Sequence, residues 1–166
     1  MARTWWECEP RRFARDRAEV AERFSGLEWE ESGAGGWFGR LPLWPFERSA
    51  PPGLAELTGG MGLLVHLRYG HAYPAAAPRL EPLDPKPPLD ARTDQRWHVL
   101  GDGNLCLMQS PSQWTGRESP VGLLLKAAGW RVEYELMSCG AIDAMTINGI
   151  VDDAVLDDTI AELAHA

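Results

Sequence analysis

One cysteine of this chain stands in a setting that could support nucleophilic chemistry. Cys106 lies in an irregular segment that contains Gly101 and Gly103, with His98 eight residues before it and Trp114 eight residues after it. A thiolate attacks acyl groups readily, and the thioester that it forms is activated toward amines. Cys106 is therefore the first candidate for a catalytic residue.

The other two cysteines, Cys8 and Cys139, are scattered along the chain, and no C-x-x-C pair is present. Three cysteines are too few for a disulfide framework, so we expect Cys8 and Cys139 to be inert. A zinc site built from His98, Cys106 and Cys139 is a weaker alternative, because closed structural zinc sites need four ligands at recognisable spacing. We expect no metal and no cofactor.

The N-terminal half of the sequence predicts one helix followed by an antiparallel sheet. Apolar residues recur at helical spacing over 10–24, and Pro10 suits the first turn of that helix. The candidate strands are 27–30, 37–43, 62–69 and an edge strand at 79–83, and the proline-rich stretch 49–55 is predicted to be a loop. Connections of these lengths favour an antiparallel meander over parallel crossovers.

The C-terminal half predicts two more helices. One begins at Ser119-Pro120 and runs over 121–128, with Gly129 as its stop. Asp152-Asp153 is predicted to open the last helix, because negative charge favours the N-terminal end of the helix dipole. The buried stripe of that last helix would consist of Val155, Leu156, Ile160 and Leu163. The fold class is α+β, with a single domain over 1–166 and an acidic helical segment from about 132.

The net charge of −8 lies in the last 35 residues, which hold eight acidic residues and no lysine or arginine. A chain that coats nucleic acid needs the opposite sign, and an acidic surface disfavours anionic membranes. The N-terminus lacks the apolar run of a signal peptide, and no stretch approaches the ~18 apolar residues of a membrane span. We therefore expect a cytoplasmic protein with reduced thiols that binds neither nucleic acid nor membrane.

The segment around Cys106 resembles the active-site stretch of ubiquitin-conjugating enzymes. Residues 103–107 read Gly-Asn-Leu-Cys-Leu, Gln113-Trp114 follows, and a Ser-Pro helix with three leucines comes next. Tyr73-Pro74 stands after the third predicted strand, where the family carries a Tyr-Pro. The resemblance is strongest over 97–114, and it implies the ubiquitin-conjugating-enzyme-like fold: an N-terminal helix, a strand meander, an active-site loop and C-terminal helices.

For this chain the resemblance implies that Cys106 carries an acyl group and that His98 is structural, fixing the loop by hydrogen bonds. The family's histidine is followed by Pro-Asn, and that asparagine supports the loop or the oxyanion of the tetrahedral intermediate. Val99-Leu100 stand in its place here, and the spacing from histidine to cysteine is two residues shorter. Asn104 could supply a carboxamide donor instead. The departure bears on aminolysis more than on thioester formation.

The resemblance also assigns residues to partner contacts. Trp114, Ser138 and Asp143 would lie on the substrate side of the site, although core packing is the simpler role for the tryptophan. The first helix carries the arginines that would help to dock an activating enzyme: Arg11, Arg12 and Arg15. An ordinary solvated helix face is the alternative interpretation of these arginines.

The resulting expectation is a bacterial, cysteine-dependent acyltransferase that takes the C-terminus of a donor protein onto Cys106 and transfers it to an amine. Stand-alone relatives occur in antiphage operons, where the donor is a ubiquitin-like protein or a cGAS-like nucleotidyltransferase. Two alternatives stay open: a catalytically inactive relative that serves as a protein-binding module, and a cysteine hydrolase that uses Cys106 and His98. Papain-like hydrolases place their histidine far downstream of the cysteine, which argues against the hydrolase.

Overall fold

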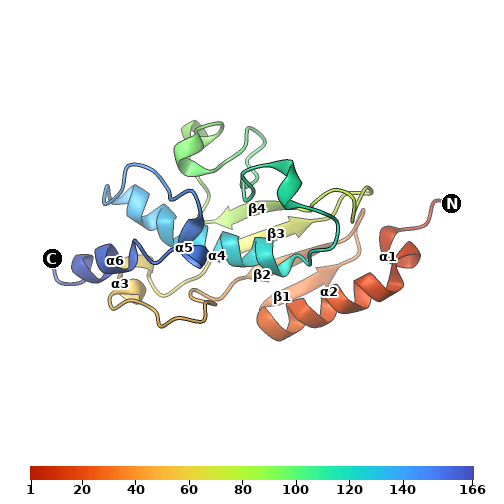
Figure 1. The fold of residues 1–166 in the computed structure, drawn as a ribbon, viewed down its shortest axis with the longest axis horizontal. Coiled ribbons are helices and arrows are strands. Elements are labelled where there is room, and N and C mark those ends of the chain that lie inside the picture. The colour runs from red at the N-terminus through yellow and green to blue at the C-terminus, as the bar shows by residue number, and fades with distance from the viewer.

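Four antiparallel strands form the centre of the protein, whose computed structural model describes residues 1–166 (Figure 1). The strands are β1 (Leu27–Glu30), β2 (Gly36–Arg40), β3 (Leu64–Arg68) and β4 (Arg79–Asp84), and they lie in the order β1-β2-β3-β4. Every neighbouring pair is antiparallel, so the predicted meander is confirmed. An N-terminal helix and C-terminal helices complete an α+β fold.

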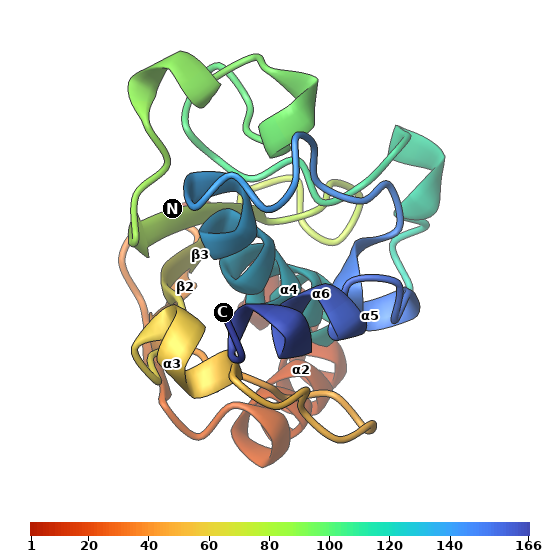
Figure 2. The same cartoon turned by 90° about the vertical axis from the view of Figure 1, so that its left-hand side faces the viewer.

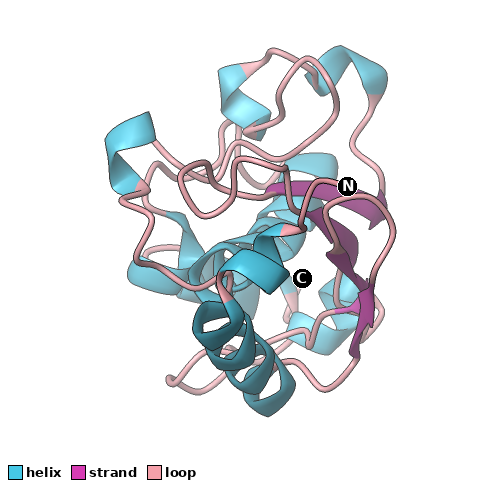
Figure 3. Cartoon of the chain, turned by 90° about the vertical axis from the view of Figure 1, so that its right-hand side faces the viewer, coloured by secondary structure: helices cyan, strands magenta, loops and turns pink.

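Alternation along β3 decides which face of the sheet is covered. Val65 and Leu67 are fully buried, whereas His66 between them is only half-buried. The buried side chains pack against Leu124 of the long helix α4 (Val121–Ser138). Helices therefore cover one face of the sheet, as Figure 3 shows, and the face that carries His66 stays open to solvent.

The N-terminal helix α2 (Pro10–Arg23) has the predicted bounds to within one residue, and a short helix α1 (Trp5–Cys8) precedes it. The sequence analysis missed α1. Its signal is a capping box, in which Thr4 and Glu7 satisfy each other's backbone and side-chain groups at the start of the helix. α1 places Trp5 in the core, where the indole N–H donates to the carbonyl of Ala34 at 2.7 Å.

Two predictions in the middle of the chain were wrong, one of a loop and one of a helix end. The stretch 49–55 is not wholly a loop, because α3 (Leu54–Thr58) begins within it between glycines in the left-handed conformation. Gly129 does not end the second helix, since α4 continues through it to Ser138. A methyl group at Gly129 would lie 3.5 Å from the side chain of Ile150, which is ordinary contact, so neighbouring structure supports the helix at this glycine.

The acidic C-terminal segment also differs from the prediction. Residues 132–138 belong to α4, and two short helices follow it, α5 (Gly149–Asp152) and α6 (Asp157–Leu163). The last helix therefore opens at Asp157-Asp158 instead of Asp152-Asp153, and the same dipole argument applies there. In the predicted stripe Leu156 and Ile160 are buried, but Val155 and Leu163 are exposed, because 155 precedes the helix and 163 ends it.

Two hydrophobic clusters hold these elements together. The larger one, which we call the sheet core, joins 22 buried residues of α1, α2, the sheet, the loops after β4 and the first half of α4. The smaller one, the C-terminal core, consists of six aliphatic residues: Leu54, Val132, Leu136, Ile150, Leu156 and Ile160. Figure 2 shows α3, α5 and α6 next to α4, whose second half contributes Val132 and Leu136 to this cluster.

The chain between β4 and α4 is mostly irregular, as expected, with three single-turn 3-10 helices at Leu89–Ala91, Gln95–Trp97 and Pro111–Gln113. It lies above β4 in Figure 1 and carries Cys106. No helix of the protein combines the length and the apolar composition that crossing a membrane requires.

Candidate functional site

Cys106 lies at the end of a tight hairpin that begins at His98. Val99 pairs with Leu105 across the hairpin, and the N–H of Cys106 donates to the carbonyl of His98 at 2.8 Å. The turn contains Gly103 in the left-handed conformation, which glycine adopts without strain. The hairpin therefore brings together the histidine and the cysteine that the sequence analysis had singled out.

The hairpin is anchored to the body of the protein on one side only. Val99 and Leu105 are buried in the sheet core, and the N–H of Leu105 donates to the carbonyl of Leu80 in β4 at 2.9 Å. Successive side chains of an extended segment point to opposite sides. Because Leu105 points into the core, Cys106 points away from it, and its half-buried thiol lies 3.6 Å from the carbonyl oxygen of Met108.

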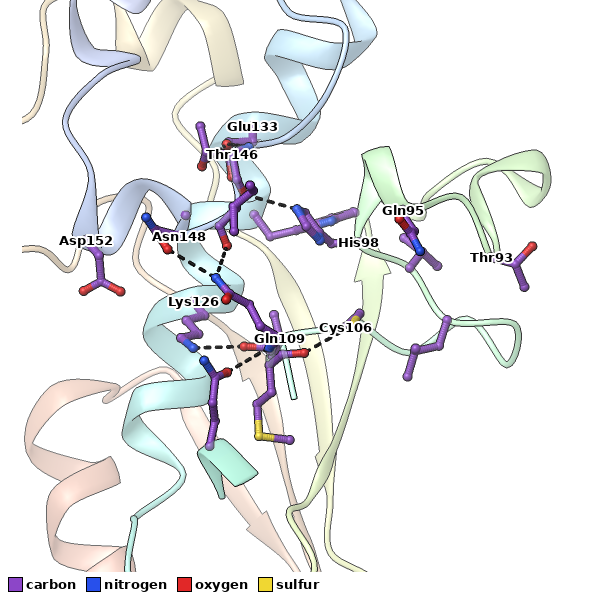
Figure 4. A pocket seen from close by; sticks show the side chains of 18 of the residues that line it. Thr93, Gln95, His98, Cys106, Gln109, Lys126, Glu133, Thr146, Asn148 and Asp152 are labelled. Atoms are coloured by element: carbon purple, nitrogen blue, oxygen red, sulfur yellow. Dashed lines mark hydrogen bonds between the residues drawn. The ribbon is translucent and has the colours of Figure 1, made fainter. Parts of the chain in front are cut away.

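A cavity of about 590 Å³ opens beside Cys106. Its volume is in the range of pockets that accept small ligands or peptide ends. The walls come from the hairpin, from α4 and from the segment that precedes α5, and they include His98, Gln109, Lys126, Glu133 and Thr146 (Figure 4). The Cys106 thiol thus faces a mixed polar and apolar space and is not enclosed by apolar neighbours.

The segment Thr146–Asn148 forms one wall of this cavity and is bound to the chain on both sides of Cys106. Nε2 of His98 lies 3.1 Å from the carbonyl oxygen of Thr146, and the side-chain amide of Gln109 donates to the carbonyl of Ile147 at 3.3 Å. The same amide donates to the side chain of Asn148 at 3.2 Å. These bonds fix the width of the cavity next to the thiol.

Glu133 holds the same segment from the side of α4. Its side chain is nearly inaccessible, with 2% relative exposure, and Oε1 accepts hydrogen bonds at 2.7 Å from both the N–H and the hydroxyl of Thr146. Burial raises the pKa of Glu133 above its ordinary value, while the bonds from Thr146 and the nearby His98 act in the opposite direction. A carboxyl group of this kind at a cavity wall is a recognised feature of functional sites.

Lys126 contributes the ammonium group at the cavity. It is half-buried on α4, and Nζ donates to the carbonyl of Leu107, the residue after Cys106, at 3.0 Å. The only other lysine of the chain is Lys86, which is exposed in the proline-rich segment after β4. Lys126 therefore ties α4 to the segment that follows Cys106 and places positive charge close to it.

No model of a known protein family matches the chain, and no curated protein matches it.

Of the other residues predicted for the site, none lines the cavity. Asn104 belongs to the hairpin turn, where its carbonyl accepts from the N–H of Leu100 at 2.8 Å. Trp114 is buried in the sheet core and donates from its indole to the carbonyl of Pro74. Ser138 and Asp143 are exposed at and after the end of α4. Polar side chains do line the cavity beside Cys106, but they belong to Thr146 and Asn148 and not to Ser138 and Asp143.

Of the three predicted arginines of α2, one is exposed to solvent and two form hydrogen bonds with the rest of the protein. Arg11 is exposed, but Arg12 is largely buried and donates to the carbonyls of Gly116 and Glu118. Arg15 donates to the carbonyl of Arg117 at 3.0 Å. Arg12 and Arg15 thus fasten α2 to the loop before α4, so neither the docking role nor the solvated-face alternative describes Arg12.

The sequence analysis missed Gln109, Lys126, Glu133 and Thr146. A usable signal existed only for the first two, since Gln109 is three residues from the cysteine and Lys126 interrupts the apolar run of α4. Glu133 and Thr146 meet the cavity because α4 continues past Gly129, which the sequence analysis had taken as the helix end. The structure groups no three His, Cys, Asp or Glu side chains in a way that could hold a metal ion.

Proposed function

We propose that this protein is a ubiquitin-conjugating-enzyme-like acyl carrier that accepts the C-terminus of a donor protein on Cys106 and passes it to an amine. The observation that carries the proposal is the placement of the thiol. Cys106 lies on an anchored hairpin after a four-strand meander, points away from the core and faces a cavity. A carrier needs this combination, because one partner delivers the acyl group and another removes it.

The helix and strand order supports the same fold proposal. An N-terminal helix, a meander of four strands, an irregular cysteine-bearing segment and then a long helix follow one another, as the resemblance to ubiquitin-conjugating enzymes implies. The described hydrogen bond from Cys106 N–H to the His98 carbonyl supports the structural role that the resemblance gives to the histidine.

The proposed loading step is a thioester exchange. The Cys106 thiolate attacks the carbonyl carbon of the donor's C-terminal thioester, a new C–S bond forms, and the donor's thiolate leaves when the old C–S bond breaks. In the second step the neutral amine of the acceptor attacks the same carbon, an amide C–N bond forms, and the Cys106 thiolate is released. The amine nitrogen loses one proton to solvent or to a basic side chain of the cavity.

The acceptor half of the reaction has the weaker structural support. The family's asparagine is replaced by Leu100, and Asn104 lies outside the cavity. The polar groups that do reach the cavity next to the thiol are those of His98, Gln109 and Lys126. Nε2 of His98 already donates to the Thr146 carbonyl, and the Gln109 amide already donates to Ile147 and Asn148. We propose that the ammonium group of Lys126, which has donors beyond its bond to Leu107, takes over the hydrogen bonding to the tetrahedral intermediate that the missing asparagine provides elsewhere.

We further propose that the protein works in the cytoplasm in bacterial antiphage defence, with a ubiquitin-like protein or a cGAS-like nucleotidyltransferase as donor and an activating enzyme as the loading partner. The support for this context is the resemblance alone. The short active-site hairpin and the replaced Pro-Asn distinguish the chain from the usual pattern of the family.

Intact mass spectrometry tests the carrier activity directly. A tagged peptide that ends in Gly-Gly as a thioester with a small thiol serves as the donor probe. Wild-type protein should gain the mass of the peptide, and dithiothreitol should remove it. Cys106→Ser should lose this reducible adduct, whereas Cys8→Ser and Cys139→Ser should retain it, although both of those cysteines are more exposed. An adduct that follows exposure instead of Cys106 would refute the proposal.

A protein-binding module without catalytic activity is the second candidate, and the loss of the motif asparagine favours it. In that case no reducible adduct forms on Cys106 with the peptide probe or with a genetically adjacent donor protein. A hydrolase has less support, because His98 lies eight residues upstream of Cys106, whereas papain-like hydrolases place their histidine far downstream of the cysteine. Turnover of the peptide thioester to free acid, abolished in His98→Ala, would favour the hydrolase.

A further inference from the structure

Three residues from three parts of the chain are hydrogen-bonded in series at the wall of the cavity. Glu133 in α4 accepts two bonds from Thr146, and the carbonyl of Thr146 contacts the imidazole of His98 on the hairpin (Figure 4). His98 in turn accepts the N–H of Cys106 with its own backbone carbonyl. The chain of contacts therefore runs from a buried carboxyl group to the backbone of the candidate nucleophile.

The chemistry of these groups fixes the direction of each bond. A carbonyl oxygen can only accept, so Nε2 of His98 must carry the hydrogen of its bond to Thr146. A neutral imidazole has one hydrogen on its two nitrogens, and Nδ1 is then the nitrogen with a free lone pair. The Thr146 carbonyl thus selects one tautomer of His98, provided that the carbonyl is held in place.

Glu133 is the group that holds it. Two bonds of 2.7 Å to one carboxylate oxygen fix both the backbone N–H and the side chain of Thr146, which leaves its carbonyl little freedom to turn. The position of Glu133 is itself fixed, because the residue is buried on a long, regular helix that packs into both hydrophobic cores.

We propose that Glu133 is a positioning residue for the Cys106 site: it fixes Thr146, and through Thr146 it holds His98 in the Nε2-protonated tautomer with Nδ1 as the proton acceptor. The proposal assigns His98 a defined protonation geometry beyond its backbone role in the hairpin. It also explains why a carboxyl group remains buried at this wall although burial of a charge is costly.

The charged groups around Glu133 are consistent with this role. His98 faces it from the hairpin, and Asp153 lies near enough after α5 to act on its ionisation. Lys126 and Asp152 line the same cavity, from α4 and from the end of α5. A positive charge on His98 would lower the pKa of Glu133, whereas the negative charge of Asp153 raises it.

Nuclear magnetic resonance of the full chain tests the positioning without any donor. The ring nitrogen shifts of His98 at about pH 8, where imidazoles are mostly neutral, report which nitrogen carries the hydrogen. Wild type should show the Nε2-protonated form. Glu133→Gln should show it too, because the amide oxygen can accept both bonds from Thr146. Glu133→Ala should give a mixture of tautomers and faster hydrogen exchange at the Thr146 amide.

Two further variants protect the test against a loss of folding. Glu133→Asp keeps the charge but shortens the side chain by one methylene group, so it should also give mixed tautomers if Glu133→Ala fails to fold. Glu135→Ala is the matched control on the same helix, because Glu135 bonds Arg131 at 2.8 Å outside the cavity. It should leave the tautomer unchanged. A single Nε2-protonated form in every Glu133 variant would overturn the proposal.

The consequence for acyl transfer rests on the proposed function, and a separate measurement addresses it. In the peptide-thioester assay Glu133→Ala should slow loading of Cys106 about tenfold, since small displacements at a reacting site cost about that much or more, and Glu133→Gln should stay within about twofold of wild type. A changed tautomer without a changed loading rate would uphold the positioning and overturn its link to transfer. An absence of loading in wild type would instead refute the proposed function and leave the tautomer result intact.

Discussion

The two hydrophobic cores of the protein differ in size and in composition, and α4 is the one element that runs through both. The sheet core joins 22 buried residues and includes Trp5, Tyr69 and Tyr73, whose rings contact one another. The C-terminal core has six residues, all aliphatic, from α3 to α6. The first core fixes the sheet against α1, α2 and α4, and the second holds the short helices α3, α5 and α6 against the second half of α4.

The candidate site lies where the two cores meet. Val99 and Leu105 anchor the Cys106 hairpin in the sheet core. On the other wall, the segment 146–148 runs from Met145, a member of the sheet core, to Ile150, a member of the C-terminal core. The hairpin is therefore held by the larger of the two cores, while the opposite wall of the cavity is connected to both.

The largest loss of stability is expected from a substitution at a completely buried residue of the sheet core. Phe24 is completely buried at the end of α2, and Phe24→Ala should reduce the free energy of unfolding by about 3–5 kcal/mol. Because the large core binds α2, the sheet and α4 together, the whole protein should lose stability in one transition. Chemical denaturation checks this. Phe38→Ala is the matched control, since Phe38 lies on the open face of the sheet at 38% exposure and should cost much less.

A deletion in the C-terminal core should have a smaller and more local effect. Ile160 of α6 is completely buried. Ile160→Ala should reduce the free energy of unfolding by about 2 kcal/mol, the lower end for such a change, because the C-terminal core contains only six buried residues. Amide hydrogen exchange should show lost protection in α5 and α6 and retained protection in β3. Leu163→Ala, at the exposed end of the same helix, is the control. Equal loss of protection in β3 would show that the two cores are one cooperative unit.

The same difference explains how much of the fold the sequence predicts. Helix α2 and the strands β1 and β4 were predicted to within one residue, and proline marks the start of that helix. The predicted strands 37–43 and 62–69 extend up to three residues beyond the ends of β2 and β3. The helices of the C-terminal core were not predicted as closely. Gly129 looks like a helix stop in sequence, but tertiary contact with Ile150 carries α4 past it. At Gly129 the low helix propensity of glycine is outweighed by a tertiary contact with a residue that comes later in the chain.

The site was predictable only where its residues are close in sequence. His98 and Cys106 belong to one hairpin, so their spacing alone brought them together. Glu133 and Thr146 reach the cavity through the length of α4 and the path of the segment after it, neither of which local patterns indicate. The resemblance assigned Ser138 and Asp143 to the substrate side of the site, but they lie outside the cavity, because the helix carries residue 138 beyond it.

The pH dependence of stability provides a test of Glu133, which lies on α4 where the two cores meet. Burial raises its pKa in the folded protein, so the folded state holds this proton at a higher pH than the unfolded state does. The contribution of Glu133 to stability is therefore greatest at low pH and is lost as the pH rises from the usual carboxyl pKa of ~4.3 through the raised value. Glu133→Gln cannot titrate, yet it keeps an acceptor for Thr146.

The thermal midpoint of Glu133→Gln should thus exceed that of wild type at about pH 7.5, and the difference should vanish below about pH 4. Parallel melting curves of the two proteins across this range measure it, and titration of all other groups cancels in the difference. A constant difference at every pH would mean that the pKa of Glu133 is not raised in the folded protein.

The smallest expected change in stability concerns Gly129, where α4 contacts Ile150 of the C-terminal core. Glycine in a helix interior costs about 0.5–1 kcal/mol relative to alanine, and a methyl group at Gly129 would meet the side chain of Ile150 at an ordinary distance of 3.5 Å. Gly129→Ala should therefore raise the free energy of unfolding by about that amount. Gly122→Ala is the control, since it lies in the first turn of the same helix with open space around it and should gain less. If Gly129→Ala destabilises the protein while Gly122→Ala does not, then the crossing of α4 and α5 is too tight for a methyl group, and the C-terminal core requires glycine at this position.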